Sequence, residues 1–124
     1  MQVGRKTHKE ILNAYSLLRE LSDTKLPAQT AYDLFKLVRS LEPVVNFRLR
    51  EEQKLMSAYH LDNDMNFETL DDATKMLSEV NALDALEEDI ELDKPTVRLQ
   101  DLGPLSINDI SILSEFITFE TGGE

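Results

Sequence analysis

The sequence contains no cysteine and no tryptophan, and it is poor in glycine, proline and aromatic residues. Of its 124 residues, four are Gly, four are Pro and 6% are aromatic. The lack of cysteine excludes disulfides, thiolate metal sites and cysteine nucleophiles, and it fits a reducing compartment. Scarce glycine and proline argue against a loop-rich or all-β fold. This scarcity favours helices, and because aromatic residues are sparse, a core must be built mainly from Leu, Ile, Val and Ala.

Long apolar runs are missing as well. No stretch approaches the ~18 uninterrupted apolar residues of a membrane helix. The segment Met1–Glu10 is polar, and no apolar run follows it that could serve as a signal peptide. We therefore expect a cytoplasmic protein that does not bind a membrane. The length fits one domain, which we expect over residues 1–120, followed by a flexible tail at 121–124.

Positive charge is scarce in the second half of the chain. Residues 1–60 contain ten Lys/Arg and seven Asp/Glu, whereas residues 61–124 contain three Lys/Arg and seventeen Asp/Glu, so the formal net charge is −11. Two interpretations stay open. The acidic half keeps the protein soluble and partly neutralises the basic half after folding, or it forms a surface that binds a basic partner.

The first two segments with helical periodicity predict an antiparallel helical hairpin. A T-x-x-E capping box at Thr7 precedes the first segment and predicts a helix over about residues 8–22. A second helix is predicted over about Pro27–His60, with its proline suited to the first turn. Pro43 lies inside this helix and predicts a kink or short break near Ser40–Glu42, because proline lacks an amide proton and crowds the preceding turn.

The second half of the chain predicts a third helix, a small β-hairpin and a short final helix. The third helix is expected over about residues 70–83, and Ser106 begins the final one. Residues 89–93 and 96–100 alternate apolar and polar side chains around the turn-like Asp93-Lys94-Pro95, which predicts the hairpin. The expected fold class is therefore mainly α: a helical hairpin with a long kinked second helix, a third helix, a small β-hairpin and a short C-terminal helix.

No pattern indicates a metal site or a cofactor, and we expect neither. Asp62–Asn66 supplies oxygen ligands like those of a calcium loop, but the glycine and the bidentate glutamate that such a loop needs are replaced by Phe67 and Ala73. His8 and His60 lack neighbours with metal-ligand spacing, so we expect both on the surface.

Catalytic motifs are missing too. The sequence has no glycine-rich phosphate loop with Lys-Ser/Thr, no G-x-S-x-G elbow and no dinucleotide fingerprint. Adjacent carboxylates such as Glu51-Glu52 and Asp71-Asp72 are expected to be solvated rather than tuned as an acid and a base. We therefore expect the protein not to be an enzyme.

Basic residues gather at the start of the chain and in the second half of the second helix. These residues are Arg5, Lys6 and Lys9, and then Arg48, Arg50 and Lys54. A nucleic-acid-binding domain is usually basic without an opposing acidic excess, and here the acidic half would repel a duplex. We expect no direct binding of nucleic acid. Instead, these cations are expected to pair with the acidic half or to lie on a solvated helix face.

The acidic block near the C-terminal end of the third helix is the candidate partner-binding site. Its six carboxylates are Asp84, Glu87, Glu88, Asp89, Glu91 and Asp93. The alternation in residues 89–93 would place three of them along one strand face. Such a row can stand in for a phosphate backbone and occupy the basic channel of a nucleic-acid enzyme. The other explanation is an edge strand that its charge protects from pairing.

Three segments resemble small proteins encoded by phages and prophages of Gram-positive bacteria. They are Ile11–Tyr15, Leu26–Tyr32, and Leu99–Leu102 together with Ser106–Ile110. That family looks like a group without an assigned activity, so the resemblance implies a genomic context, with action in the host cytoplasm. We expect a non-catalytic acidic accessory protein that binds a protein partner, in assembly or in control of a host process. The alternative is an inhibitor of a host nucleic-acid defence enzyme, of the anti-CRISPR or anti-restriction type, that uses its acidic C-terminal half as a nucleic-acid mimic.

Overall fold

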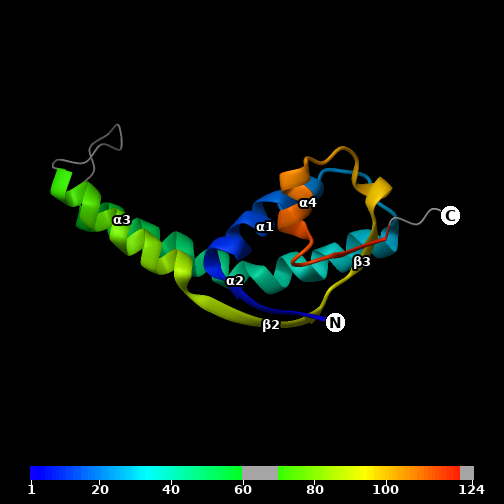
Figure 1. Ribbon diagram of the computed structural model, residues 1–124, viewed down its shortest axis with the longest axis horizontal. Coiled ribbons are helices and arrows are strands. Elements are labelled where there is room, and N and C mark those ends of the chain that lie inside the picture. Colours follow the sequence, from blue (N-terminus) through cyan, green and yellow to red (C-terminus); the bar gives the residue numbers. More distant parts are fainter. Residues whose placement is uncertain (60–69, 121–124) are drawn as a thin grey trace.

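The computed structural model describes residues 1–59 and 70–120, which form a head and a projecting arm (Figure 1). The elements are β1 (Gln2–Thr7), α1 (His8–Leu21), α2 (Ala28–Ala58), α3 (Leu70–Ala85), β2 (Glu87–Asp93), β3 (Thr96–Arg98), the 3-10 helix η1 (Leu99–Leu102), α4 (Ile107–Leu113) and β4 (Thr118–Glu120). The arm consists of residues 46–58 of α2 together with α3, and the head contains the other elements. The mainly helical fold class is confirmed. The calcium-like segment 62–66, His60 and the expected tail at 121–124 lie outside the described residues.

The capping box predicts the start of α1 correctly. The Thr7 hydroxyl accepts a hydrogen bond from the Glu10 amide at 3.2 Å, and the Glu10 carboxylate accepts one from the Thr7 amide at 2.8 Å. These bonds satisfy amide groups that the first turn leaves without helical partners. Ile11, Ala14 and Leu18 follow at spacings of three and four residues and are all buried. The helix therefore presents one apolar face to the core.

The second helix has nearly the predicted bounds, but it is not broken at its proline. It contains 31 residues, which corresponds to a length of about 46 Å. The break expected near Ser40–Glu42 is absent, because the helix continues through Pro43. Pro43 is on the exposed side of α2, where water can bind the carbonyl group that loses its helical donor. The inner face is buried as far as Arg48 and no further along the helix.

The two strands of the expected hairpin exist, but they pair with other partners. β2 pairs antiparallel with β1, and β3 pairs parallel with β4. In the first pair, Arg5 lies opposite Asp89 and Lys6 lies opposite Glu88. Cross-strand pairs of opposite charge favour this register, and Val3 and Ile90 are buried on the inner side. The acidic strand has therefore paired with the basic start of the chain, not with the segment that follows it.

A glycine permits an irregularity in the β1–β2 pair. The register shifts between Gln2 and Gly4, so that Gln2 lies opposite Asp93 whereas Gly4 lies opposite Ile90. Gly4 has a φ of 85°, in the left-handed region. A residue with a Cβ atom is strained there, whereas glycine is not. This glycine thus allows β1 to follow β2 across the shift.

The C-terminal segment completes the core of the head. Ser106 and Asp109 form a capping box for α4, as the sequence predicts. After α4, Phe116 and Ile117 are almost completely buried, and the chain then pairs as β4 with β3. In the described part of the chain, no helix is apolar over a length that could cross a bilayer.

Candidate functional site

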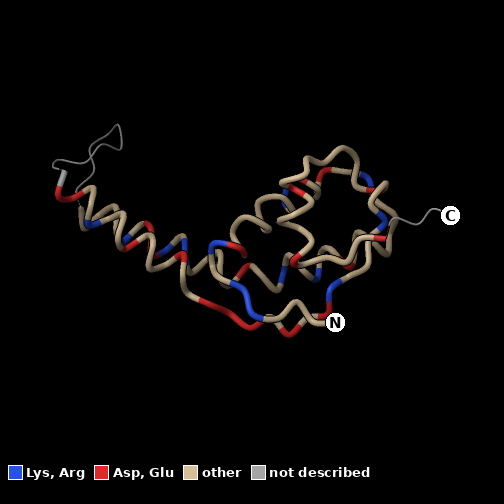
Figure 2. The backbone as a smooth tube through the Cα atoms, viewed as in Figure 1, with Lys and Arg blue, Asp and Glu red and all other residues tan. Residues whose placement is uncertain are grey.

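The acidic block is divided between the end of α3 and the whole of β2. Asp84 lies in the last turn of α3, and the other five carboxylates lie on β2. Figure 2 shows these acidic residues beside the basic part of β1, which runs next to them. Pairing with β1 therefore brings the basic residues of β1 close to the carboxylates of β2.

Three carboxylates of the block already have cationic or histidine partners within the chain. Asp84 accepts a hydrogen bond from the guanidinium of Arg48. Glu87 pairs with Arg5 at 2.6 Å, and Glu88 lies 3.2 Å from Nε2 of His8. The expectation that basic residues pair with the acidic half is confirmed for Arg5 and Arg48, and also for Lys6, which pairs with Glu115 at 3.3 Å.

The pKa of Arg5 reflects this pairing. It is raised above its ordinary value, first by the hydrogen bond to Glu87, then by the charge of Glu87, and to a smaller extent by the charge of Asp89. Asp89 therefore lies within the electrostatic reach of Arg5, although the two form no ion pair. Arginine is protonated at any physiological pH, so the shift only records that these charges are close together.

The other three carboxylates form an exposed row on β2. Asp89, Glu91 and Asp93 are exposed, whereas Ile90 between them is buried and Leu92 is half-buried. This confirms the alternation that the sequence predicts. Within the described residues, none of the three carboxylates forms an ion pair. We call Asp89, Glu91 and Asp93 the acidic row; its neighbouring members are about 7 Å apart along the strand.

His8 contradicts the sequence prediction, because it is buried and not on the surface. Its relative exposure is 3%. The Thr7 cap places it in the first turn of α1, and its amide donates a hydrogen bond to the Leu86 carbonyl at 2.7 Å. Its ring lies edge-on to Phe47, with the centroids 6.0 Å apart. Nδ1 of this ring is buried without a hydrogen-bond partner. The burial depends on the Leu86 and Glu88 contacts, which are about 80 positions away in the sequence.

His8 lines a hollow at the beginning of β2. The hollow has a volume of about 340 Å³ and is lined by His8, Pro43, Val44, Phe47, Leu86, Glu87 and Glu88. We call it the His8 hollow. Its walls are mainly apolar and aromatic, and its two carboxylates belong to the same strand as the acidic row. Long basic side chains bury an apolar stem while their charge stays near an acid or an aromatic ring. The hollow can therefore accept a lysine or arginine side chain.

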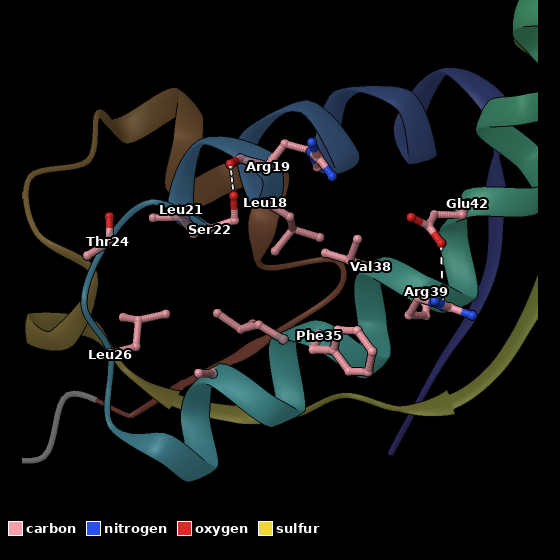
Figure 3. Close-up of a pocket in the computed structure, with 12 residues that line it drawn as sticks. Leu18, Arg19, Leu21, Ser22, Thr24, Leu26, Phe35, Val38, Arg39 and Glu42 are labelled. Carbon is pink, nitrogen blue, oxygen red and sulfur yellow. Dashed lines mark hydrogen bonds and ion pairs between the residues drawn. The ribbon is translucent and has the colours of Figure 1, made fainter.

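A second hollow lies between α1 and α2, and the sequence does not predict it. In Figure 3, Leu18 and Val38 point toward one another across it, and Phe35 lies along α2 beside it. Its volume is about 310 Å³, and Arg19, Arg39 and Glu42 contribute polar groups to its lining. This hollow is an apolar groove that displays no reactive group.

The exposed aromatic residues of α2 correct an expected part of the core. Phe35 continues the apolar stripe that Ala31, Leu34, Val38 and Leu41 form at helical spacing, which predicts that it is buried, but it is 53% exposed. Its ring stacks on Tyr32, with centroids 6.2 Å apart, and Arg39 lies over it. Leu37 is completely buried instead. The stripe of α2 therefore faces a slightly different direction from the one that the apolar spacing indicates.

The described residues offer no assembled metal centre. Among residues 1–59 and 70–120, no group of three or more His, Cys, Asp or Glu side chains is arranged to hold a metal ion. His8 and Glu88 are close together, but no third ligand joins them there. The carboxylates and the apolar walls of this region can instead bind a cationic side chain.

Comparisons with known proteins leave the family open. No protein-family model matches the chain, and neither the curated proteins nor the solved structures provide a match.

Proposed function

We propose that this protein is a non-catalytic accessory protein of the phage type, which binds a basic protein partner through the acidic row and the His8 hollow. The observation that carries the proposal is the contrast within one acidic block. Asp84, Glu87 and Glu88 are engaged with groups of the same chain, whereas the acidic row is exposed and has no ion pair among the described residues. A row of this kind can attract and orient a cationic partner.

The place of β2 in the fold supports this role. Within the described residues, β2 pairs with β1 only, so its sheet has two strands. A partner can therefore approach the row along the strand. The hollow at the start of β2 gives the same partner a place for one long basic side chain, and such buried anchors carry much of the energy of an interface. The lack of cysteine fits an action in the reducing cytoplasm of a host cell.

Charge spacing favours a basic protein segment over complete imitation of a nucleic acid. Carboxylates on alternate residues of a strand are about 7 Å apart, whereas each DNA strand carries one phosphate per ~3.4 Å of helix axis. The acidic row therefore reaches about half the linear charge density of one DNA strand. A basic nucleic-acid-binding enzyme of host defence is one partner of this kind, and it corresponds to the inhibitor alternative.

The test compares two triple variants with the same change in net charge. The first, Asp89→Asn, Glu91→Gln and Asp93→Asn, neutralises the acidic row. The second, Glu20→Gln, Asp23→Asn and Glu79→Gln, neutralises three exposed carboxylates outside the acidic block. The probe is a fluorescent lysine- and arginine-rich peptide, followed by polarisation at increasing salt concentrations.

We expect the row variant to lose at least about tenfold in affinity and the other variant to lose less than about twofold. The affinity of the wild-type chain should fall steeply with salt, because the contacts are exposed. Equal losses in the two triple variants would mean that net charge alone attracts the peptide, and the proposed site would be abandoned. If duplex DNA displaced this protein from a DNA-cleaving enzyme, that result would favour the inhibitor alternative.

A further inference from the structure

The arm has an apolar side that nothing in the described structure covers. None of residues 49–59 and 71–85 is buried, although these residues include the last ten of α2 and nearly all of α3. Leu49 is 53% exposed and Leu77 is 61% exposed. A pair of helices without buried side chains gains little from packing and is only marginally stable in water. The arm therefore differs from the head, where the same helix α2 buries Leu34, Leu37 and Leu41.

In the arm, α2 and α3 lie side by side and run in opposite directions (Figure 1). At the base, Arg48 of α2 contacts Asp84 of α3. Toward the tip, the pKa of Lys75 is raised, first by its hydrogen bond to Asp71 and least by the charge of Tyr59, which follows α2. Residues at the end of α2 are therefore near residues at the start of α3.

Helical geometry places the exposed leucines on one side of the arm. In an antiparallel pair of right-handed helices, the residue that follows an inward-facing one points to the same side of the pair on both helices. Leu49 follows the buried Arg48, and Leu77 follows the half-buried Met76. Both leucines therefore lie on the same side.

The charged residues nearest the leucines on that side, Glu52 and Asp84, both pair with Arg48 at the base of the arm. Spacings of three and four residues extend the two rows, which gives one face with the residues Leu49, Gln53, Met56, Leu77 and Asn81. We call this set the uncharged arm face. The opposite side carries Glu51, Lys54, Lys75 and Glu79, so the two sides of the arm differ in character.

We infer that a second copy of this chain packs against the uncharged arm face, so that two arms form a four-helix bundle. The chain has a net charge of −11, so two copies repel one another over most of their surfaces. The uncharged arm face is a place where close approach is not opposed by like charges. A contact with twofold symmetry uses the same face on both copies, as most homodimers do.

The charges of the two arm helices support an arrangement in which α2 of one copy lies opposite α3 of the other. Residues 46–58 contain three basic and two acidic residues, whereas α3 contains one basic and four acidic residues. The two helices thus have net charges of opposite sign. Helices of a bundle also pack well against antiparallel neighbours, and this arrangement surrounds each helix with such neighbours.

The size of the face predicts a weak dimer. Two neighbouring helices with about 13 residues in contact give a face about 20 Å long and about 20 Å wide. Each copy would therefore bury on the order of 400 Å², or about 800 Å² in total, which is the size of a weak, transient interface. The dimer should dissociate in the micromolar range.

The test is sedimentation velocity of the full chain from about 5 to about 500 µM. Leu77→Arg places a charge on the uncharged arm face, and Ser78→Arg adds the same charge one residue later, on the outer side of α3. We expect the wild-type chain to shift from monomer to dimer over this range. The dissociation constant should rise at least about tenfold in Leu77→Arg and change less than about twofold in Ser78→Arg.

Two further measurements keep the outcome interpretable. Circular dichroism at the lowest concentration shows whether Leu77→Arg is folded, and Leu77→Gln provides a milder variant that favours helix. The thermal midpoint of the wild-type chain should rise with concentration, because a dimer stabilises the folded state by mass action. A wild-type chain that stays monomeric at the highest concentration, or equal effects of the two arginine variants, would overturn the inference.

Discussion

The head and the arm contain parts of the same helix, but they use its apolar residues differently. In the head, Leu37 and Leu41 of α2 have no exposed surface. In the arm, Leu49 of the same helix is more than half exposed. The periodicity of apolar residues is similar in both parts, so it indicates which side of a helix is apolar and leaves open what covers that side. Coverage depends on which other elements reach a helix: α1 and the C-terminal segment complete the core of the head, whereas in the arm α3 is the element beside α2, and α1 touches α3 without burying any of residues 71–85.

The largest expected effect is the loss in free energy of unfolding when a leucine side chain is removed from the head, compared with the loss when one is removed from the arm. Leu37→Ala leaves a cavity in the packed head and should lower the free energy of unfolding by about 3 to 4 kcal/mol. Leu55→Ala removes a half-buried side chain of the arm and should cost about 1 kcal/mol. Urea unfolding at a concentration where the chain is monomeric measures both. Similar losses would show that the arm has a core comparable to that of the head.

The next effect concerns Arg48, which stands where the head and the arm meet. Its side chain is 7% exposed and pairs with Glu52 at 3.0 Å and with Asp84. Arg48→Ala would leave a partly buried aspartate without its cation and should cost about 2 kcal/mol. Arg50→Ala, on the exposed side of α2, should change stability by less than about 0.5 kcal/mol.

Arg48→Met distinguishes charge from packing at this position. Methionine keeps an apolar stem of similar length, so it should recover part of the loss if the stem of Arg48 matters for packing. If Arg48→Ala and Arg50→Ala were equally mild, the ion pair with Asp84 would not hold the arm to the head.

The sequence predicts the helices of this protein well because their ends follow local rules. The capping boxes at Thr7 and Ser106 involve residues only three positions apart, and both form as expected. The exception is the break expected at Pro43, which is absent. A helix tolerates this proline because Pro43 is exposed to solvent. Exposure is a property of the folded molecule, and the spacing of residues does not contain it.

Strand pairing is less predictable because it joins distant segments. β1 has one buried apolar residue, Val3, and so lacks the alternation that marks a strand. It becomes a strand because residues 87–93 supply a complementary partner. The same pairing buries His8 and neutralises Glu87. The alternation predicts the acidic row, whereas the division of the block into paired and unpaired carboxylates requires the register of β1.

The smallest expected effect tests whether the arm opens independently of the head. Ala82 is an exposed residue of α3, and Ala82→Gly should weaken this helix by about 1 kcal/mol through backbone entropy alone. Because residues 71–85 bury no side chain, α3 should open locally without unfolding the head. Hydrogen exchange should then accelerate about fivefold at the amides of α3, while the amides of α1 keep their rates.

A matched change in the head, Ser16→Gly on the exposed side of α1, should instead accelerate exchange in both regions, because loss of α1 removes the core that holds the base of the arm. Equal acceleration of exchange in α1 and α3 by Ala82→Gly would mean that the head and the arm unfold as one unit.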